Sequence, residues 1–297
     1  MTGTPRATVI VPTYDHGLTL LRSVGSALNQ TVTEIEILIV GDGPSPDGRT
    51  AALELVRGDP RVTFLDNPKG KRHGEDHRHA ALLRAQGEAV LYLCDDDLWH
   101  PHHVATMLPL LARADFAHTM PFGIAGDGEP FTLPGDLSLP ESVRRLQSGE
   151  NFIPLTCCGH TLTAYRALER GWHPAPEDLF TDVHFYQLFI EHGCALATGR
   201  VPTSVHFPSP SRTGWTAAER LAELDRWLPV LADRELWADA VEQLLAVSAL
   251  MLADATAQLD GVRASVTWRT RERLMRSAAF RAILAPLVRR LAGSTDR

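Results

Sequence analysis

Short apolar segments alternate with segments of helical periodicity along the first hundred residues. Apolar, β-branched runs predict strands at 8–11, 35–40, 62–65 and 90–94, and apolar residues three or four apart predict helices at 18–28, 50–57, 75–86 and 101–111. The strands are almost continuously apolar, which is typical of strands covered on both faces. The pattern therefore predicts an α/β fold, with a mainly parallel, twisted sheet flanked by helices.

The alternation weakens between residues 115 and 207. We expect a strand at 151–157, a helix at 181–192, and closing strands at 194–197 and 201–206. These segments complete the sheet, so the first domain is expected to span residues 1–210.

A helical C-terminal region is expected over residues 211–297. After Pro208-Ser209-Pro210 the sequence becomes rich in Ala, Leu, Arg and Glu at helical spacing, and Thr216 and Glu219 form a capping-box pattern. Pro229 should kink or divide the helix. Residues 263–297 hold nine arginines and two acids, a net charge of +7.

Acidic side chains follow two of the predicted strands. Asp42 follows the second strand, and Asp95, Asp96 and Asp97 follow the fourth. Carboxyl ends of parallel strands meet at one edge of a sheet, where ligands bind. Adjacent carboxylates repel one another, and Mg²⁺ or Mn²⁺ completed by phosphate oxygens would relieve that repulsion. The pattern indicates a phosphorylated ligand, although a solvated acidic loop is the alternative reading.

Composition excludes several function classes. The net charge is −7, which disfavours a dedicated nucleic-acid binder. Four cysteines do not form a disulfide framework, and no signal peptide is recognisable, so a cytoplasmic location is expected. The motifs of P-loop NTPases, dinucleotide-binding folds, GxSxG hydrolases and HExxH zinc proteases do not occur.

Four motifs in order resemble those of family 2 glycosyltransferases with the GT-A fold. They are 9–14 (VIVPTY), 26–31 (SALNQT), 36–43 (EILIVGDG) and 87–101 (GEAVLYLCDDDLWHP). The resemblance covers roughly residues 7–207. Gly41 and Cys94 stand where relatives often have an additional Asp, and His77 and His79 flank Arg78 in place of a frequent Ala-Arg-Asn stretch.

The resemblance implies a nucleoside-diphosphate sugar donor, with a UDP-sugar preferred, and a Mn²⁺ or Mg²⁺ cofactor. Residues implied in nucleotide binding are Pro12, Thr13, Tyr14, Asp42, Arg78, Asp95 and Asp96. Residues implied in metal binding are Asp96, Asp97 and His206, and relatives differ in which Asp of 95–97 touches the ion.

The resemblance also implies inversion of configuration with a carboxylate as general base. Family 2 enzymes usually place this base in an acidic pair that opens a helix. Asp182 occupies that place, with Thr181 replacing the first acid. Glu177 and Asp178 are alternatives, and any of the three could instead be an ordinary acid at a helix start.

The expected function is therefore metal-assisted, inverting glycosyl transfer. A nucleotidyltransferase is the alternative enzyme, although its usual Gly-rich phosphate loop does not follow the first strand. The alternative function that involves no catalysis is that of a sugar-nucleotide-binding protein. The acceptor is left open among small molecules, glycans and peptides. The C-terminal helices are too rich in Leu and Trp to stand alone in water, so we expect them to pack on the first domain, to pair with a second copy in a homodimer or to cover the acceptor site. Contact of the basic tail with a membrane is the less favoured alternative.

Overall fold

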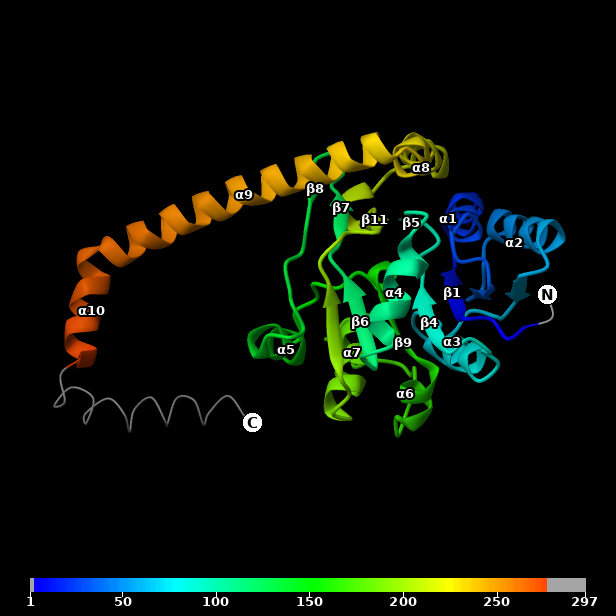
Figure 1. Cartoon of the computed structure of the whole chain (residues 1–297), viewed down its shortest axis with the longest axis horizontal. Helices are drawn as coiled ribbons and strands as arrows, with labels where there is room; N and C mark the ends of the chain where they lie inside the picture. The colour runs from blue at the N-terminus through cyan, green and yellow to red at the C-terminus, as the bar shows by residue number, and fades with distance from the viewer. Residues whose placement is uncertain (1–2, 277–297) are drawn as a thin grey trace. The chain divides into compact units, whose positions relative to one another are not determined.

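The computed structural model describes residues 3–276 (Figure 1). Residues Met1–Leu244 form one compact unit, and a second unit begins at Leu245. The strands are β1 (Ala7–Thr13), β2 (Ile35–Gly41), β3 (Val62–Leu65), β4 (Ala89–Tyr92), β5 (Leu98–Trp99), β6 (Phe116–Thr119), β7 (Phe122–Ile124), β8 (Pro130–Phe131), β9 (Cys158–Thr161), β10 (Leu196–Gly199) and β11 (Ser204–His206). The α-helices are α1 (Thr19–Leu28), α2 (Pro46–Gly58), α3 (Glu75–Leu82), α4 (His103–Leu111), α5 (Pro140–Gln147), α6 (Leu162–Ala167), α7 (Thr181–Glu191), α8 (Ala217–Ala232), α9 (Arg234–Ala264) and α10 (Val266–Arg276).

A seven-stranded sheet in the order β10-β6-β9-β4-β1-β2-β3 forms the centre of the first unit. Strands β1, β2, β3 and β4 pair in parallel, and β10 pairs in parallel with β6. Strand β9 runs antiparallel to both of its neighbours, β4 and β6. The predicted α/β architecture with a mainly parallel sheet is confirmed, and the carboxyl ends of β1, β2, β4 and β6 share one edge.

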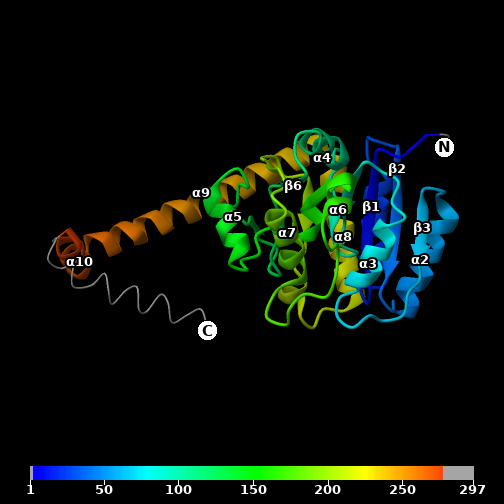
Figure 2. The ribbon, with the colours of Figure 1, turned by 90° about the horizontal axis from the view of Figure 1, so that it is seen from below.

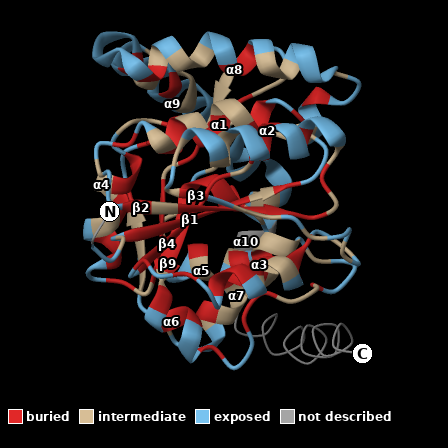
Figure 3. Ribbon diagram, turned by 90° about the vertical axis from the view of Figure 1, so that its right-hand side faces the viewer, coloured by how far each residue is buried: buried red, intermediate tan, exposed pale blue. Residues whose placement is uncertain are grey.

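Helices cover both faces of this sheet, as Figures 2 and 3 show. On one face, Val9, Val11 and Ile37 pack with residues of α1, α2 and α4. On the other face, Ile10 and Val40 pack with residues of α3, α6 and α7. The continuous apolar strands of the sequence follow from this two-sided burial.

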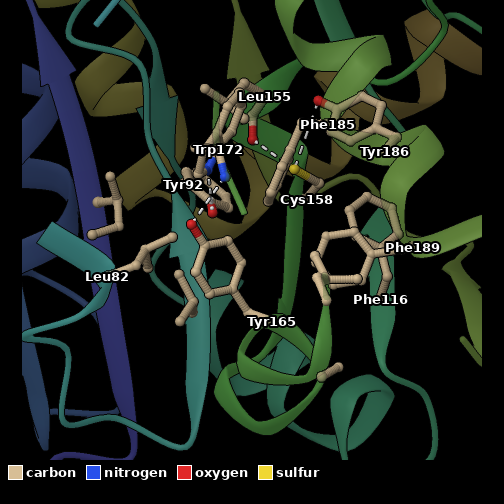
Figure 4. Packing of buried hydrophobic residues seen from close by; sticks show 14 of the residues in the cluster. Leu82, Tyr92, Phe116, Leu155, Cys158, Tyr165, Trp172, Phe185, Tyr186 and Phe189 are labelled. Carbon is tan, nitrogen blue, oxygen red and sulfur yellow. Dashed lines mark hydrogen bonds between the residues drawn. The ribbon is translucent and has the colours of Figure 1, made fainter. Parts of the chain in front are cut away.

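Aromatic side chains fill the core beneath α7 (Figure 4). Trp172 stacks on Phe185 with ring centroids 3.8 Å apart, and its indole N–H donates to the Tyr92 hydroxyl at 2.9 Å. The Tyr186 hydroxyl donates to the backbone carbonyl of Ile153. Packing of this kind holds the start of α7 rigidly against the carboxyl edge of the sheet.

A second, four-stranded sheet in the order β5-β11-β7-β8 lies next to this edge. Its buried residues, including Leu98, Phe122 and Val205, share a core with Leu224 and Leu231 of α8 and with Trp237 and Leu244 of α9. The first part of the C-terminal helical region therefore belongs to the compact unit that contains the main sheet. The expected domain boundary at residue 210 stays a prediction.

Several element boundaries differ from those expected. The strand expected at 151–157 is wrong: a 3₁₀ turn occupies Leu155–Cys157, and β9 follows it. The helix expected at 50–57 begins earlier, at Pro46, because the Ser45 side chain caps it. The helix expected to reach residue 86 ends at Leu82.

The helix α8 continues through Pro229 to Ala232, so the expected division at this proline is wrong. Leu224 and Leu231, on either side of it, are both buried in the same core. Their packing offsets the backbone hydrogen bond that proline removes. The chain divides instead at Asp233, whose carboxylate accepts hydrogen bonds from the first backbone N–H groups of α9.

Candidate active site

Loops that follow β1, β2, β4 and β11 meet at the carboxyl edge of the main sheet. The backbone N–H of Asp42 donates to the carbonyl of Thr13 at 2.9 Å, and that of Ser45 donates to the carbonyl of Tyr14 at 2.8 Å. These bonds join the first two loops, which carry the residues predicted to bind a nucleotide base. Pro12 and Thr13 lie at the end of β1.

Asp42 lies at the centre of the predicted base pocket. Its carboxylate is buried and accepts hydrogen bonds from Lys69 Nζ and the Gly70 backbone N–H, both at 2.5 Å. The Lys69 ammonium also lies 5.0 Å from the centre of the Tyr14 ring. Gly74, at φ +75°, packs so closely that a Cβ there would lie 2.9 Å from Asp42 Cβ. Asp42 thus holds the 69–74 loop in place. The ion pair between Lys69 and Asp42 was not predicted from the sequence.

The three consecutive aspartates are all buried and have different partners. Both oxygens of Asp97 face His206 Nδ1, the nearer at 3.0 Å, and one accepts from the backbone N–H of Phe207. Asp95 pairs with His16 Nδ1 at 2.7 Å. Asp96 accepts from the Ser209 hydroxyl at 2.9 Å. The structure therefore brings His206 to the triplet, as predicted.

Charges at this centre shift one another's protonation. Burial and the neighbouring Asp97 raise the pKa of Asp96 to about 6. Burial opposes the charged form of His16, but the hydrogen bond and charge of Asp95 outweigh it and raise the pKa of His16 to about 10. Burial likewise opposes the charge on His206, and Asp97 outweighs it, so the pKa of His206 is raised.

The donor set fits a hard divalent cation. Within the described residues, His16, Asp95 and Asp96 offer ligand atoms that lie within 4.8 Å of one another. Asp95 Oδ2 is buried and has no hydrogen-bond partner, so one carboxylate oxygen at this centre is available as a ligand. Carboxylate oxygens supplemented by imidazole suit Mn²⁺ and Mg²⁺ better than soft metals.

Three residues at this centre were not anticipated from the sequence: His16, Ser209 and Arg220. The Arg220 guanidinium, on α8, lies 3.5 Å from Asp96 Oδ2 and donates to Ser209 Oγ at 3.2 Å. Arg220 lies in the helical C-terminal region, where nothing in the sequence pattern distinguishes it from other exposed helix arginines. His16 follows the motif at 9–14 by two residues, which is the one signal that could have identified it.

Asp182, the predicted base, lies in the first turn of α7 and is half-buried. Burial raises its pKa, while the positive charges of Arg78, His73 and His206 act in the opposite direction. Its other electrostatic neighbours include Cys94 and Cys158, whose thiols burial keeps protonated by raising their pKa. The alternatives Glu177 and Asp178 are exposed on the preceding loop. Asp182 is less exposed than either alternative and interacts electrostatically with Arg78 and His206, so it is the better placed of the three to accept a proton.

Arg78 is a buried cation with unused donors. It lies 4.2 Å over the Trp172 ring, and Nη1 donates to the carbonyl of His73. Nε and Nη2 are buried and have no partner within the described residues. A guanidinium left unsatisfied in this way is ready to bind an anion or a carbonyl oxygen.

Glu75 ties the loop before α3 to the start of α7. Its carboxylate accepts from the Thr181 hydroxyl at 2.5 Å and from the backbone N–H of His73 at 3.0 Å. Arg72 reaches the same part of the chain by donating to the carbonyl of Pro176 at 2.6 Å. The loop before α3 and the start of α7 are therefore fixed to each other through the charged side chains of Arg72 and Glu75.

Comparison with known families gives one family match. The model described as "Glycosyl transferase family 2" matches residues 8–172.

Among curated relatives, the chain is 31% identical over 114 residues to the GalNAc(5)-diNAcBac-PP-undecaprenol beta-1,3-glucosyltransferase of Campylobacter jejuni. This match covers 38% of the chain and 37% of that relative. It is 29% identical over 160 residues to the putative colanic acid biosynthesis glycosyl transferase WcaA of Escherichia coli, covering 52% of the chain and 56% of WcaA. The matches thus span between about a third and somewhat more than half of the relatives' length.

Among solved structures, the chain is similar to residues 1–349 of TarS from S. aureus, with a TM-score of 0.55 at 19% identity over 76% of the chain and 65% of TarS. It is also similar to the mannosyltransferase PcManGT from Pyrobaculum calidifontis, solved with GDP-Man and Mn²⁺, with a TM-score of 0.50 at 18% identity over 95% of the chain and 87% of PcManGT. These likenesses confirm the GT-A fold.

Proposed function

The chain belongs to glycosyl transferase family 2, and from this premise we propose that it transfers a sugar from a nucleoside-diphosphate sugar to an acceptor with inversion of configuration. The observation that carries the proposal is that Asp182 interacts electrostatically with Arg78 and His206, and that His206 lies 3.0 Å from Asp97 of the buried Asp95–Asp97 triplet. A base, a free guanidinium and a metal-binding acid cluster are what such a displacement requires.

The donor's base would lie between Tyr14 and Asp42. Asp42 would accept a hydrogen bond from a base N–H, and Tyr14, which is 47% exposed, offers an aromatic face. TarS has been solved with UDP-GlcNAc and PcManGT with GDP-Man, which supports a nucleotide sugar as the donor class. We favour a UDP-sugar for this chain.

The diphosphate would lie over the acidic triplet. Asp96, Asp97 and His206 would hold Mn²⁺ or Mg²⁺, with Asp95 and His16 offering further ligand atoms, and a bound ion would supply positive charge for the departing diphosphate. Arg220, held next to Asp96 by Ser209, would bind the diphosphate oxygens directly. Arg78 would use Nε and Nη2 to bind the donor from the opposite side.

Asp182 would act as the general base. One of its carboxylate oxygens takes the proton of the acceptor hydroxyl as that oxygen attacks the anomeric carbon. The bond from this carbon to the diphosphate oxygen breaks, and the diphosphate leaves with the electron pair. A single displacement of this kind inverts the configuration at the anomeric carbon.

The acceptor is proposed only as a hydroxyl-bearing molecule, among small molecules, glycans and peptides. A cytoplasmic location is proposed because all four cysteines are free thiols.

Release of nucleoside diphosphate from a panel of sugar nucleotides tests the proposal. We expect release with at least one UDP-sugar when Mn²⁺ or Mg²⁺ is present, and its loss when EDTA is added. Release of pyrophosphate from a nucleoside triphosphate would identify a nucleotidyltransferase instead. Tight donor binding without turnover under any metal condition would indicate a binding protein. Retention of configuration in the product would overturn the single displacement.

A further inference from the structure

A regular apolar stripe runs along α9. Its positions alternate in steps of four and three residues, which is the seven-residue repeat of helices that pair side by side. The members are Val241, Leu245, Ser248, Leu252, Ala255, Leu259 and Val262. Leucine recurs at one position of the repeat, and the small residues Ser248 and Ala255 occupy the other. Small residues there allow a second helix to approach closely.

The large members of the stripe are exposed beyond the first unit. Val241 packs against the core that α8 and α9 share with the second sheet. From Leu245 onward, the residues of α9 belong to no core cluster of the described chain. Leu252 is 69% exposed and Leu259 is 50% exposed. Leucines repeated over this length are costly to leave in water, so the pattern indicates a partner.

The charges along the two helices indicate what that partner is. From residue 235 to residue 262, α9 carries five acids and no basic residue. By length and composition α9 could cross a membrane, but Asp254 and Asp260 interrupt its apolar part. An anionic bilayer surface would repel such a helix. In contrast, α10 carries four arginines and one acid. In an antiparallel pair, a second copy of this chain offers both a matching apolar stripe and, beyond the end of that stripe, a basic segment opposite in charge to the acidic one.

We propose that the chain forms a homodimer through this stripe, with Leu245, Leu252 and Leu259 at its centre. From Leu245 to Val262 the paired helices would run side by side for about 27 Å. The proposal depends on the helix pattern alone and not on the chemistry of the active site.

Sedimentation equilibrium of the full chain at micromolar concentrations tests the proposal. We expect a mass of twice 32.6 kDa for the wild type. Replacing Leu252 and Leu259 with Ala preserves helix propensity but removes packing from both copies, so we expect the dimer dissociation constant to rise by about tenfold or more. Leu250→Ala is the matched control: Leu250 is 72% exposed but lies outside the stripe, and its replacement should leave the constant unchanged.

Three outcomes would overturn the proposal. A wild type that stays monomeric at these concentrations would mean that the stripe is covered within one chain. A dimer that survives both leucine replacements, with helix content unchanged by circular dichroism, would place the interface elsewhere. A monomer that floats with phosphatidylglycerol vesicles would identify the partner as a membrane. Nucleoside diphosphate release, measured on the same samples, reports separately on the proposed function.

Discussion

Opposing influences set the protonation of Asp182, the residue that we propose as general base. Burial among the thiols of Cys94 and Cys158 raises its pKa, and the nearby Arg78 limits the rise. A base needs a pKa close enough to the working pH to accept a proton, yet must be ionised beforehand. An aspartate with a raised pKa meets both requirements better than an exposed one.

We predict that Asp182→Asn lowers turnover by about 10²–10⁴-fold, the usual contribution of a general base, with little change in UDP affinity. In the wild type, turnover should fall as the pH drops through the raised pKa of Asp182, because protonation removes the acceptor of the proton. Steady-state rates and calorimetric titration with UDP measure the two quantities. Asp178→Asn is the matched control on the exposed loop, and a loss of turnover there instead would reassign the base.

Arg220 allows recognition of the diphosphate to be separated from recognition of the base. We predict that Arg220→Gln weakens UDP binding by about ten- to a hundredfold, because a charge-assisted hydrogen bond contributes roughly 1.5–3 kcal/mol. Binding of uridine, which has no phosphate, should not change. Arg226→Gln on the exposed side of the same helix provides the control. Equal weakening of UDP and uridine would show that Arg220 supports the fold of the site and not the diphosphate.

Individual site residues differ in how well the sequence predicts them. Asp42 and the aspartate triplet come just after strands of the main sheet, so strand order alone places them at one edge. His206 ends β11 of the second sheet, and it reaches Asp97 because β11 pairs with β5. His16, Glu75 and Arg220 reach the site through loop conformation and helix packing, which have no short-range signature. The partnership of Asp42 with Lys69 is hidden for the same reason, since it depends on the close approach of Gly74.

At the scale of elements, a buried ion pair fixes the segment that follows β11. The Arg212 guanidinium pairs in a bidentate manner with the Glu223 carboxylate of α8, and both side chains are almost fully buried. Arg212 also donates to the backbone carbonyls of Ile124 and Pro208. The segment between β11 and α8, which carries Ser209, is held in place by this pair.

We predict that Arg212→Ala lowers the free energy of unfolding by about 3–5 kcal/mol, because it leaves the Glu223 carboxylate buried without a partner. The double variant Arg212→Met, Glu223→Leu should recover much of this loss. Arg144→Ala, which breaks the exposed pair with Glu141, should cost no more than about 1 kcal/mol. Urea unfolding of the four proteins gives the comparison, and equal costs for Arg212→Ala and Arg144→Ala would contradict the buried-pair interpretation.

Elements with strong periodicity are predicted well by the sequence, and those defined by long-range contacts are not. The strands β1, β2, β3 and β4 match their apolar runs closely. The strand β9 is short and contains Gly159 and His160, so nothing local marks it as a central strand. The prediction at Pro229 fails for a related reason. The proline removes a backbone hydrogen bond, but packing of the residues on both sides of it keeps α8 continuous.

At the scale of the whole molecule, three buried histidines link stability to pH. Burial lowers the pKa of His103 to about 3 and that of His118 and His160 to about 4. In the unfolded chain these side chains take up protons near pH 6.5, whereas in the folded protein they stay neutral. Stability contributed by their neutral forms is therefore present above pH 6.5 and is lost as the pH falls toward 4.

We predict that the folded state loses about 2 kcal/mol per buried histidine between pH 7 and pH 5. The raised pKa values of Asp96, Asp182, His16 and His206 act in the opposite direction over this range, so the net loss should be smaller than the sum for the three imidazoles. Thermal unfolding followed at both pH values should show a lower midpoint at pH 5. His118→Gln should reduce the difference between the two midpoints by the contribution of one histidine. A midpoint that is independent of pH would mean that these imidazoles are not neutral in the folded protein.

The antiparallel strand β9 also constrains the order in which the protein can assemble during synthesis. Strands β1 to β4 pair through contacts within the first 92 residues, so the half of the sheet that carries Asp42 can form early. Within the described residues, β6 hydrogen-bonds to this half of the sheet through β9, so this strand pairing must wait until residue 161 has emerged from the ribosome. The proposed base and His206 follow later still. The nascent chain would therefore form the part of the site that carries Asp42 before the part that carries Asp182 and His206. Pairing of β9 would be the event after which the remaining strands can join the sheet.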